Sequence, residues 1–230
     1  MMDPDLVSLT ITLKLAGVTT LILVLVGTPL AWWLARTNNI AGFIIEPIVA
    51  LPIVLPPTVV GFYLLILFSP ESAFGQLWIS LTGHSLAFTF EGLVFGSIIY
   101  SLPFYVQPLQ VAFENVRQDL LDAAATLGAG PVDRFFNIVV PLSRTGFVVA
   151  TTLAFAHTVG EFGIVLMIGG NIPDETRVLS IALFDHVETL QYQRAHLLAA
   201  GLLVFSFFLL LIVYTVNRKW KRQSPGRLTS

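Results

Sequence analysis

Long apolar runs separated by short polar segments make up most of the chain. Five of the runs approach or exceed the roughly 20 residues that an α-helix needs to cross a bilayer. Their polarity does not alternate with the period of two that a transmembrane β-strand shows. The pattern predicts a single all-α membrane domain over residues 1–230, with spanning helices at about 6–35, 41–68, 88–113, 142–170 and 195–216.

The second predicted span contains residues that interrupt a helix. Pro52, Pro56 and Pro57 each remove a backbone donor, and such prolines kink a helix unless neighbours satisfy the freed carbonyls. The kink serves packing alone, or it has a functional role. Thr58 follows the prolines and is a candidate for lining a polar route through the bundle, with packing against small residues as the alternative.

A polar, helix-prone segment at residues 114–141 separates the third span from the fourth. The alanine run 123–125 favours helix, Gly128 suits a left-handed helix end, and Pro131 suits the first turn of a following helix. We therefore expect two short helices that meet at Gly128, the second of them closed by Pro141. A structured element between two spans presents a surface to something outside the bilayer.

Composition supports a membrane protein. The chain is 55% hydrophobic and 11% charged, with a mean hydropathy of +0.82, whereas soluble domains carry roughly 25% charged residues. There is no cysteine, which excludes disulfides and thiolate chemistry. The four histidines are scattered rather than at metal-ligand spacing, and there is no phosphate-binding loop of the Walker type. ATP, if it is used, must bind to another chain.

The distribution of basic residues predicts the orientation. Residues 69–87 form a predicted loop without lysine or arginine, which the positive-inside rule assigns to the outside. If 114–141 and the C-terminus lie inside, nine basic residues are inside, and only Arg177 and Arg194 are outside. The nine are Arg36, Arg117, Arg134, Arg144, Arg218, Lys219, Lys221, Arg222 and Arg227. We therefore expect an outside N-terminus and a cytoplasmic C-terminus.

The segment between the third and fourth spans resembles the cytoplasmic loop of ATP-binding-cassette importer permeases. Asp122-Ala123-Ala124 is followed after three residues by Gly128, and after nine more by Ile138-Val139-Val140-Pro141. The family pattern has Glu in place of Asp122 and Leu in place of Val140. Both departures are mild, because one acidic residue replaces another and one aliphatic residue replaces another. The resemblance implies a coupling helix that docks in a groove of a separate ATPase subunit. The alternative is an interfacial helix without a partner, with an apolar stripe formed by Leu120, Leu121, Ala124 and Leu127.

A later stretch resembles the molybdate branch of these permeases. Residues 153–163 read LAFAHTVGEFG, and residues 169–177 read GGNIPDETR. In that branch Leu-Ala-Phe-Ala leads to Gly-Glu-Phe-Gly, and Asn-Ile-Pro-Gly-Glu-Thr follows outside. Here Asp174 replaces the glycine, and His157 stands where arginine is more common. The resemblance continues to about Glu188, with further matches at Leu51-Pro52, Leu55-Pro56-Pro57, Phe88-Thr89-Phe90 and Leu127-Gly128-Ala129-Gly130.

This resemblance implies the membrane subunit of a type I importer that carries molybdate across the bacterial cytoplasmic membrane. It also implies a lipid-embedded homodimer, two cytoplasmic ATPase subunits that bind ATP and Mg, and an extracytoplasmic molybdate-binding protein. No nucleic-acid partner, metal, cofactor or catalytic residue is expected in this chain. Tungstate or sulfate is the alternative substrate. An ion-coupled carrier or an intramembrane enzyme is more distant, because we find neither an internal repeat nor a base–nucleophile pair or HExxH motif.

An acidic residue within the fourth span, Glu161, is costly in a membrane and by default functional. Gly160 and Gly163 flank it and favour a helix break or a close helix approach, and a break would allow a sixth crossing. Because an ionised carboxylate repels an oxyanion, we expect Glu161 to hold a gate or a structural latch. Direct substrate contact and simple exposure are the alternatives. His157 lies one turn earlier and could pair with it.

Overall fold

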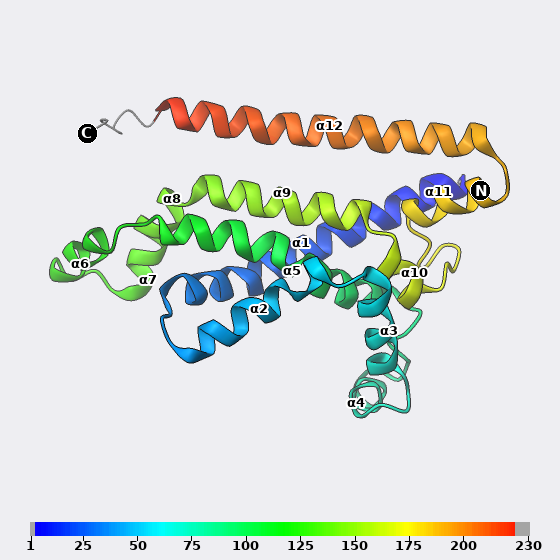
Figure 1. Cartoon of the computed structure of the whole chain (residues 1–230), viewed down its shortest axis with the longest axis horizontal. Coiled ribbons are helices and arrows are strands. Elements are labelled where there is room, and N and C mark those ends of the chain that lie inside the picture. Colours follow the sequence, from blue (N-terminus) through cyan, green and yellow to red (C-terminus); the bar gives the residue numbers. More distant parts are fainter. Residues whose placement is uncertain (1–2, 224–230) are drawn as a thin grey trace.

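The computed structural model describes residues 3–223, with side chains for residues 3–215, and in this part every regular element is helical (Figure 1). The predicted all-α architecture is therefore confirmed. The elements are α1 (Pro4–Arg36), α2 (Ile40–Val54), α3 (Pro57–Phe68), α4 (Ala73–Thr82), α5 (Phe90–Glu114), α6 (Gln118–Thr126), α7 (Pro131–Arg134), the π-helix η1 (Phe135–Val139), α8 (Val140–Leu142), α9 (Arg144–Gly160), α10 (Gly163–Gly169), α11 (Leu179–Glu188) and α12 (Tyr192–Gln223).

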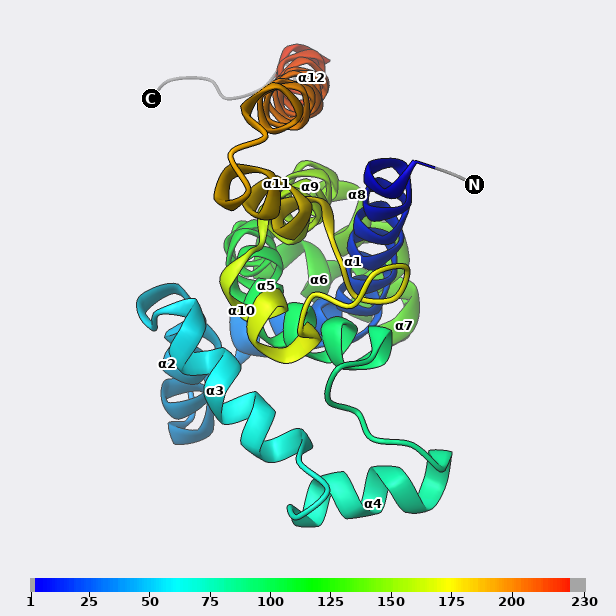
Figure 2. The same cartoon turned by 90° about the vertical axis from the view of Figure 1, so that its right-hand side faces the viewer.

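Three long helices, α1, α5 and α9, pack together at the centre of the fold (Figures 1 and 2). Small residues allow this close approach, as is common between helices in membranes. A Cβ atom at Gly27 would lie 2.6 Å from the ring of Tyr105, and one at Gly146 would lie 2.2 Å from the Cβ of Ala112. These two glycines therefore set how closely α1 and α9 approach α5.

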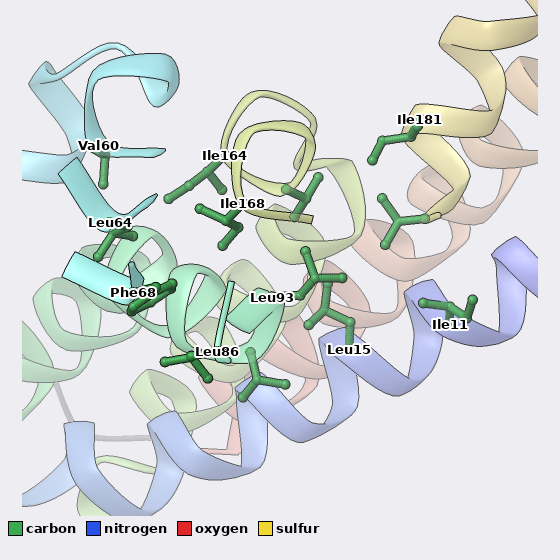
Figure 3. Close-up of a cluster of buried hydrophobic side chains, with 13 residues drawn as sticks. Ile11, Leu15, Val60, Leu64, Phe68, Leu86, Leu93, Ile164, Ile168 and Ile181 are labelled. Carbon is green, nitrogen blue, oxygen red and sulfur yellow. The ribbon is translucent and has the colours of Figure 1, made fainter. Parts of the chain in front are cut away.

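Buried apolar side chains form two clusters, one toward each end of the central helices. The first cluster joins the beginning of α1 to α3, α5, α10 and α11, and Ile11, Leu64, Phe68 and Ile168 point into it (Figure 3). The second joins the end of α1 to α5 and α9, with Tyr105 fully buried at its centre. The two ends of the bundle are thus packed separately and are connected by the shared helices α1 and α5.

The second predicted span consists of two helices rather than one. α2 ends at Val54 and α3 begins at Pro57, and the two axes differ by 113°. Leu55 and Pro56 have extended conformations between them. Because prolines have no N–H, a break at this point leaves fewer unsatisfied donors in an apolar environment. The predicted kink is present and takes the form of a complete break.

The prediction that residues 69–87 form only a loop is wrong, because α4 lies within it. The hydroxyl of Ser72 caps α4 by accepting a hydrogen bond from the N–H of Gly75 (2.8 Å). At the other end, Gly83 has a φ of 83°, the left-handed conformation that glycine adopts readily. Both signals are readable in the sequence, but Pro70, Gly75 and Gly83 are also typical of a loop.

The second helical piece of the segment ends one residue after Pro141. The helical run that starts at Pro131 continues through η1 and α8 to Leu142, and it bends by 75° where α9 begins. Pro141 lies in the short element α8, which follows the π-helix η1 directly. The bend falls at Ser143, whose ψ of 9° lies outside the helical range.

α12 stands apart from the central bundle (Figure 2). Only 6% of its most apolar 18-residue window is buried, compared with 56% for α5. A helix that is apolar all round must be covered by lipid or by another chain. The predicted basic tail, Arg218, Lys219, Lys221, Arg222 and Arg227, lies outside the side chains that the structure describes.

A hydrogen bond between distant parts of the chain generates a stability prediction. The hydroxyl of Thr12 in α1 accepts from the N–H of Leu179 at 2.7 Å, and so caps the buried start of α11. In Thr12→Val this donor loses its partner, which costs about 1–3 kcal/mol. We expect a lower midpoint of thermal unfolding in detergent. The matched control is Thr10→Val on the exposed side of the same helix; an equal loss in both variants would contradict the prediction.

Candidate functional site

The predicted coupling segment, α6 with the turn into α7, lies at one end of the bundle (Figure 1). After α6, the N–H of Ala129 donates to the carbonyl of Ala124 at 3.0 Å. Gly128 has a φ of 90°, a conformation that L-residues rarely adopt. Pro131 then begins α7. The expected glycine corner between two short helices is therefore present.

Arg36, at the end of α1, holds the start of this segment in place. Its guanidinium donates to the carbonyls of Phe113 (3.3 Å) and Val116 (3.0 Å) and to the side chain of Gln118 (3.1 Å). The same group lies 4.7 Å from the ring centroid of Trp32. One side chain therefore ties together the end of α1, the end of α5 and the first residue of α6. The sequence indicated only a cytoplasmic charge at this position.

The outer face of α6 is exposed. Leu121 packs inward, whereas Leu127 at the end of the helix is 89% exposed. Ala124 is partly exposed, and the exposed residues around it include Leu120, Asp122, Ala123, Ala125, Thr126 and Gly128. The predicted apolar stripe is therefore split between an inner and an outer face. Small residues beside two exposed leucines, Leu120 and Leu127, form a surface that another protein can approach closely.

Charges at the beginning of α6 are paired locally. The guanidinium of Arg117 donates to the carboxylate of Asp119 and holds the pKa of that carboxyl below its ordinary value. The ionised carboxylate lies in the first turn of α6, where negative charge is favourable. Gln118 donates to the carboxylate of Asp122 at 2.9 Å. Asp122 is thus exposed but held in one orientation.

At the other end of the bundle, the fourth predicted span is broken at Glu161. α9 ends at Gly160, and α10 begins at Gly163 after two residues that are not helical. The carboxylate of Glu161 accepts from the N–H of Ile164 at 3.1 Å, and its carbonyl accepts from Ser180 at 2.5 Å. Glu161 is buried. The residue therefore caps α10 and ties the break to α11, which is a latch-like arrangement.

The break at Glu161 lies against the proline break between α2 and α3. A Cβ atom at Gly163 would lie 2.7 Å from the Cβ of Pro57, so a side chain has no room there. A Cβ atom at Gly160, in contrast, would meet no atom of another element within 4 Å. Pro56 and Thr58 are exposed beside this contact. The structure thus brings together the predicted pathway residues of two different spans, although the chain separates them by about a hundred residues.

The possible pairing of His157 with Glu161 does not occur. His157 instead makes a 3.0 Å hydrogen bond from Nδ1 to the hydroxyl of Ser101 on α5. Its ring stacks on Phe104, with centroids 3.8 Å apart. The i,i+4 spacing was correct, but the helix ends at Gly160, which directs Glu161 to a different set of partners. The sequence did hold a signal that His157 has a role independent of Glu161, because a polar side chain within a membrane span is costly.

A comparison with protein families identifies the class to which this helical bundle belongs. Residues 27–222 match the family described as binding-protein-dependent transport system inner membrane component. This match covers most of the chain, and the chain belongs to that family. It is therefore a membrane subunit of a binding-protein-dependent transport system, and the resemblance to importer permeases that its motifs predicted is confirmed.

Particular relatives are more closely similar. The chain is 55% identical to the molybdenum transport system permease protein ModB of Azotobacter vinelandii, covering 94% of this chain and 96% of the relative. It is 33% identical to the protein of the same name from Escherichia coli K12, over 98% and 97% of the two chains. A probable sulfate transport system permease protein, cysT, of Marchantia polymorpha is 31% identical over 88% of this chain and 70% of the relative.

Solved structures share the fold. A bacterial transporter involved in the import of alginate gives a TM-score of 0.69 at 17% identity, covering 97% of this chain and 81% of that one. A second alginate transporter structure, in complex with a periplasmic protein that holds an alginate pentasaccharide, gives 0.71 at 18% identity, covering 99% and 82%. The predicted fold of a type I importer permease is therefore confirmed.

The different surroundings of the two glycines near Glu161 generate a matched prediction. In Gly163→Ala the new methyl group meets the rigid ring of Pro57, which should separate α3 from α10 at a cost of about 1–3 kcal/mol. In Gly160→Ala the methyl group enters open space. We expect a lowered unfolding midpoint and slower transport for Gly163→Ala alone. Identical behaviour of the two variants would show that this contact does not hold the break.

Proposed function

We propose that the chain is the membrane-spanning subunit of an ATP-driven importer that translocates molybdate across the bacterial cytoplasmic membrane. The observation that carries this proposal is the 55% identity, over 94% of the chain, to a molybdenum transport permease. The stretch 153–177, with its GEFG and NIPDET sequences, lies at the end of the bundle opposite α6. The chain itself performs no covalent chemistry in this proposal.

The working assembly proposed here is a homodimer with two cytoplasmic ATPase subunits and an extracytoplasmic binding protein for molybdate. One support is the exposure of the α6 face, where Ala123, Ala124 and Leu127 offer a docking surface. A second is the exposed apolar length of α12, which requires lipid or protein around it. ATP and Mg bind to the ATPase subunits, and the N-terminus lies outside with the C-terminus in the cytoplasm.

The proposed mechanism is alternating access. Closure of the ATPase subunits on ATP moves α6, and Arg36 transmits the movement to α1 and α5 because it binds the carbonyls at the end of α5. α1 and α5 also contribute to the cluster that packs α3 and α10. Asp122, Ala123, Ala124, Gly128 and Pro141 act in coupling, and the residues around the two breaks, Pro56, Pro57, Thr58, Gly160, Glu161 and Gly163, act as gate or pathway.

Sulfate or tungstate is the second candidate substrate. The 31% identity to a probable sulfate permease of Marchantia polymorpha favours considering sulfate. All three anions are tetrahedral dianions, which a pathway of hydroxyls and backbone groups need not distinguish. A binding assay on the partner binding protein separates the candidates: tight binding of molybdate with weak binding of sulfate supports the proposal, and the reverse order contradicts it. An ion-coupled carrier is the more distant alternative.

The docking surface on α6 generates a prediction about assembly. Ala124→Glu places a bulky charge among small residues, and Gly128→Pro imposes a negative φ where the chain has 90°. We expect either variant to insert into the membrane normally and to lose co-purification of the ATPase subunit. The matched control is Ala73→Glu, the same substitution at an exposed alanine. Ala73 begins α4, which lies far from α6 (Figure 1). Normal co-purification with Ala124→Glu would remove α6 from the coupling role.

A further inference from the structure

His157 belongs to a chain of hydrogen bonds that fixes where its protons lie. Nδ1 is 3.0 Å from the hydroxyl of Ser101, which is 2.9 Å from the hydroxyl of Thr158. The hydroxyl of Thr158 in turn donates to the carbonyl of Ala154 at 2.9 Å. Ser101 and Thr158 are buried, so no solvent competes for these contacts. Each hydroxyl has a single hydrogen to donate.

Only one arrangement of protons makes all three contacts hydrogen bonds. Because Thr158 gives its hydrogen to a carbonyl, which cannot donate, it must accept from Ser101. Ser101 has then used its own hydrogen and must accept from His157. Nδ1 of His157 therefore carries a proton. In the neutral ring this leaves Nε2 as a bare acceptor, and Nε2 becomes a donor only when the ring is an imidazolium.

Nε2 is the free end of this chain. Within the part of the protein described with side chains, Nε2 has no hydrogen-bond partner, and it is not among the buried polar atoms that lack one. Nε2 is therefore not fully buried, and His157 as a whole is half-buried. Aromatic rings fix its direction: Phe104 stacks on the imidazole at 3.8 Å, and the ring of Tyr100 lies 5.1 Å away.

Among the described residues, the titratable side chain beside this ring is Tyr100 on α5. Glu161, one turn further along the chain, is bonded to the N–H of Ile164 instead. Arg144 is at the opposite end of α9. Charged groups on the neighbouring helices are engaged elsewhere, since Lys14 lies over the ring of Phe90 and Asp5 binds His186. Among the described residues, no lysine or arginine is in contact with the His157 ring on the α5–α9 face.

We infer that His157 is an oxyanion contact of the transport pathway and that it binds the anion only in its imidazolium form. A bare Nε2 lone pair repels a dianion, whereas Nε2–H of an imidazolium gives a charge-assisted hydrogen bond. Passage of the anion is thereby linked to protonation of this ring. The inference rests on the proposed function, because it requires that an oxyanion passes along the face of α5 and α9.

The first test measures proton positions and does not depend on transport. In ¹⁵N-histidine spectra of the purified permease complex at neutral pH, the signals lost in His157→Gln identify this ring. We expect a protonated Nδ1 and an unprotonated Nε2. In Ser101→Ala, which removes the acceptor for Nδ1–H, a substantial fraction of the opposite tautomer should appear. A protonated Nε2 with a bare Nδ1 in the wild type would overturn the inference.

The second test measures ATP-driven uptake of labelled molybdate into proteoliposomes across a pH series, at subsaturating loaded binding protein. The ratio of wild-type to His157→Arg uptake cancels the pH effects on the other subunits. We expect this ratio to fall as the pH rises, by up to about tenfold per pH unit, because one proton is linked and the guanidinium stays charged. The matched control is His84→Arg at an exposed histidine, whose ratio to wild type should stay constant.

The outcomes separate the inference from the proposed function. A constant ratio of wild type to His157→Arg, with molybdate uptake intact, would overturn the inference and leave the proposed function standing. Absence of molybdate uptake by the wild type at every pH, with an assembled complex, would overturn the proposed function and with it the role of His157. Ser101→Ala provides an independent variant: its uptake should be less sensitive to pH than that of the wild type.

Discussion

The need to satisfy backbone hydrogen bonds without water governs this fold. In an apolar environment a chain can leave the helical conformation only where prolines remove donors or side chains replace the lost partners. The two breaks meet this requirement differently. Pro56 and Pro57 remove N–H groups between α2 and α3, whereas Glu161 supplies a carboxylate to the first turn of α10. Because the breaks also contact each other through Gly163, they form one unit rather than two separate defects.

The end of the bundle that carries α6 is organised around a different interaction. Arg36 occupies the carbonyls at the end of α5 and the first residue of α6, so α1, α5 and α6 meet at one guanidinium. α1 and α5 then run through both apolar clusters to the opposite end, where α3 and α10 pack. Packed helices therefore connect α6 to the two breaks, and in the proposed mechanism a displacement of α6 is carried along them.

Local signals in the sequence predicted much of this arrangement. Hydrophobic runs predicted the long apolar helices α1, α5 and α12, and the alanines, Gly128 and Pro131 predicted the corner after α6, because these features depend on neighbours in the chain. Tertiary contacts were not accessible. The contact of Gly163 with Pro57 and the reach of Arg36 to Val116 join residues far apart in sequence. The hydrogen bond of His157 to Ser101 was missed for the same reason, since helical spacing pointed to Glu161 instead.

The central claim is that ATP, bound by partner subunits, drives molybdate through this chain. The most direct measurement is accumulation of labelled molybdate in vesicles that contain the permease, its ATPase and the binding protein, with and without ATP. The account predicts accumulation against a gradient when ATP is present, and none when ATP or the ATPase subunit is omitted. Accumulation that persists without ATP, and that follows an ion gradient instead, would contradict it.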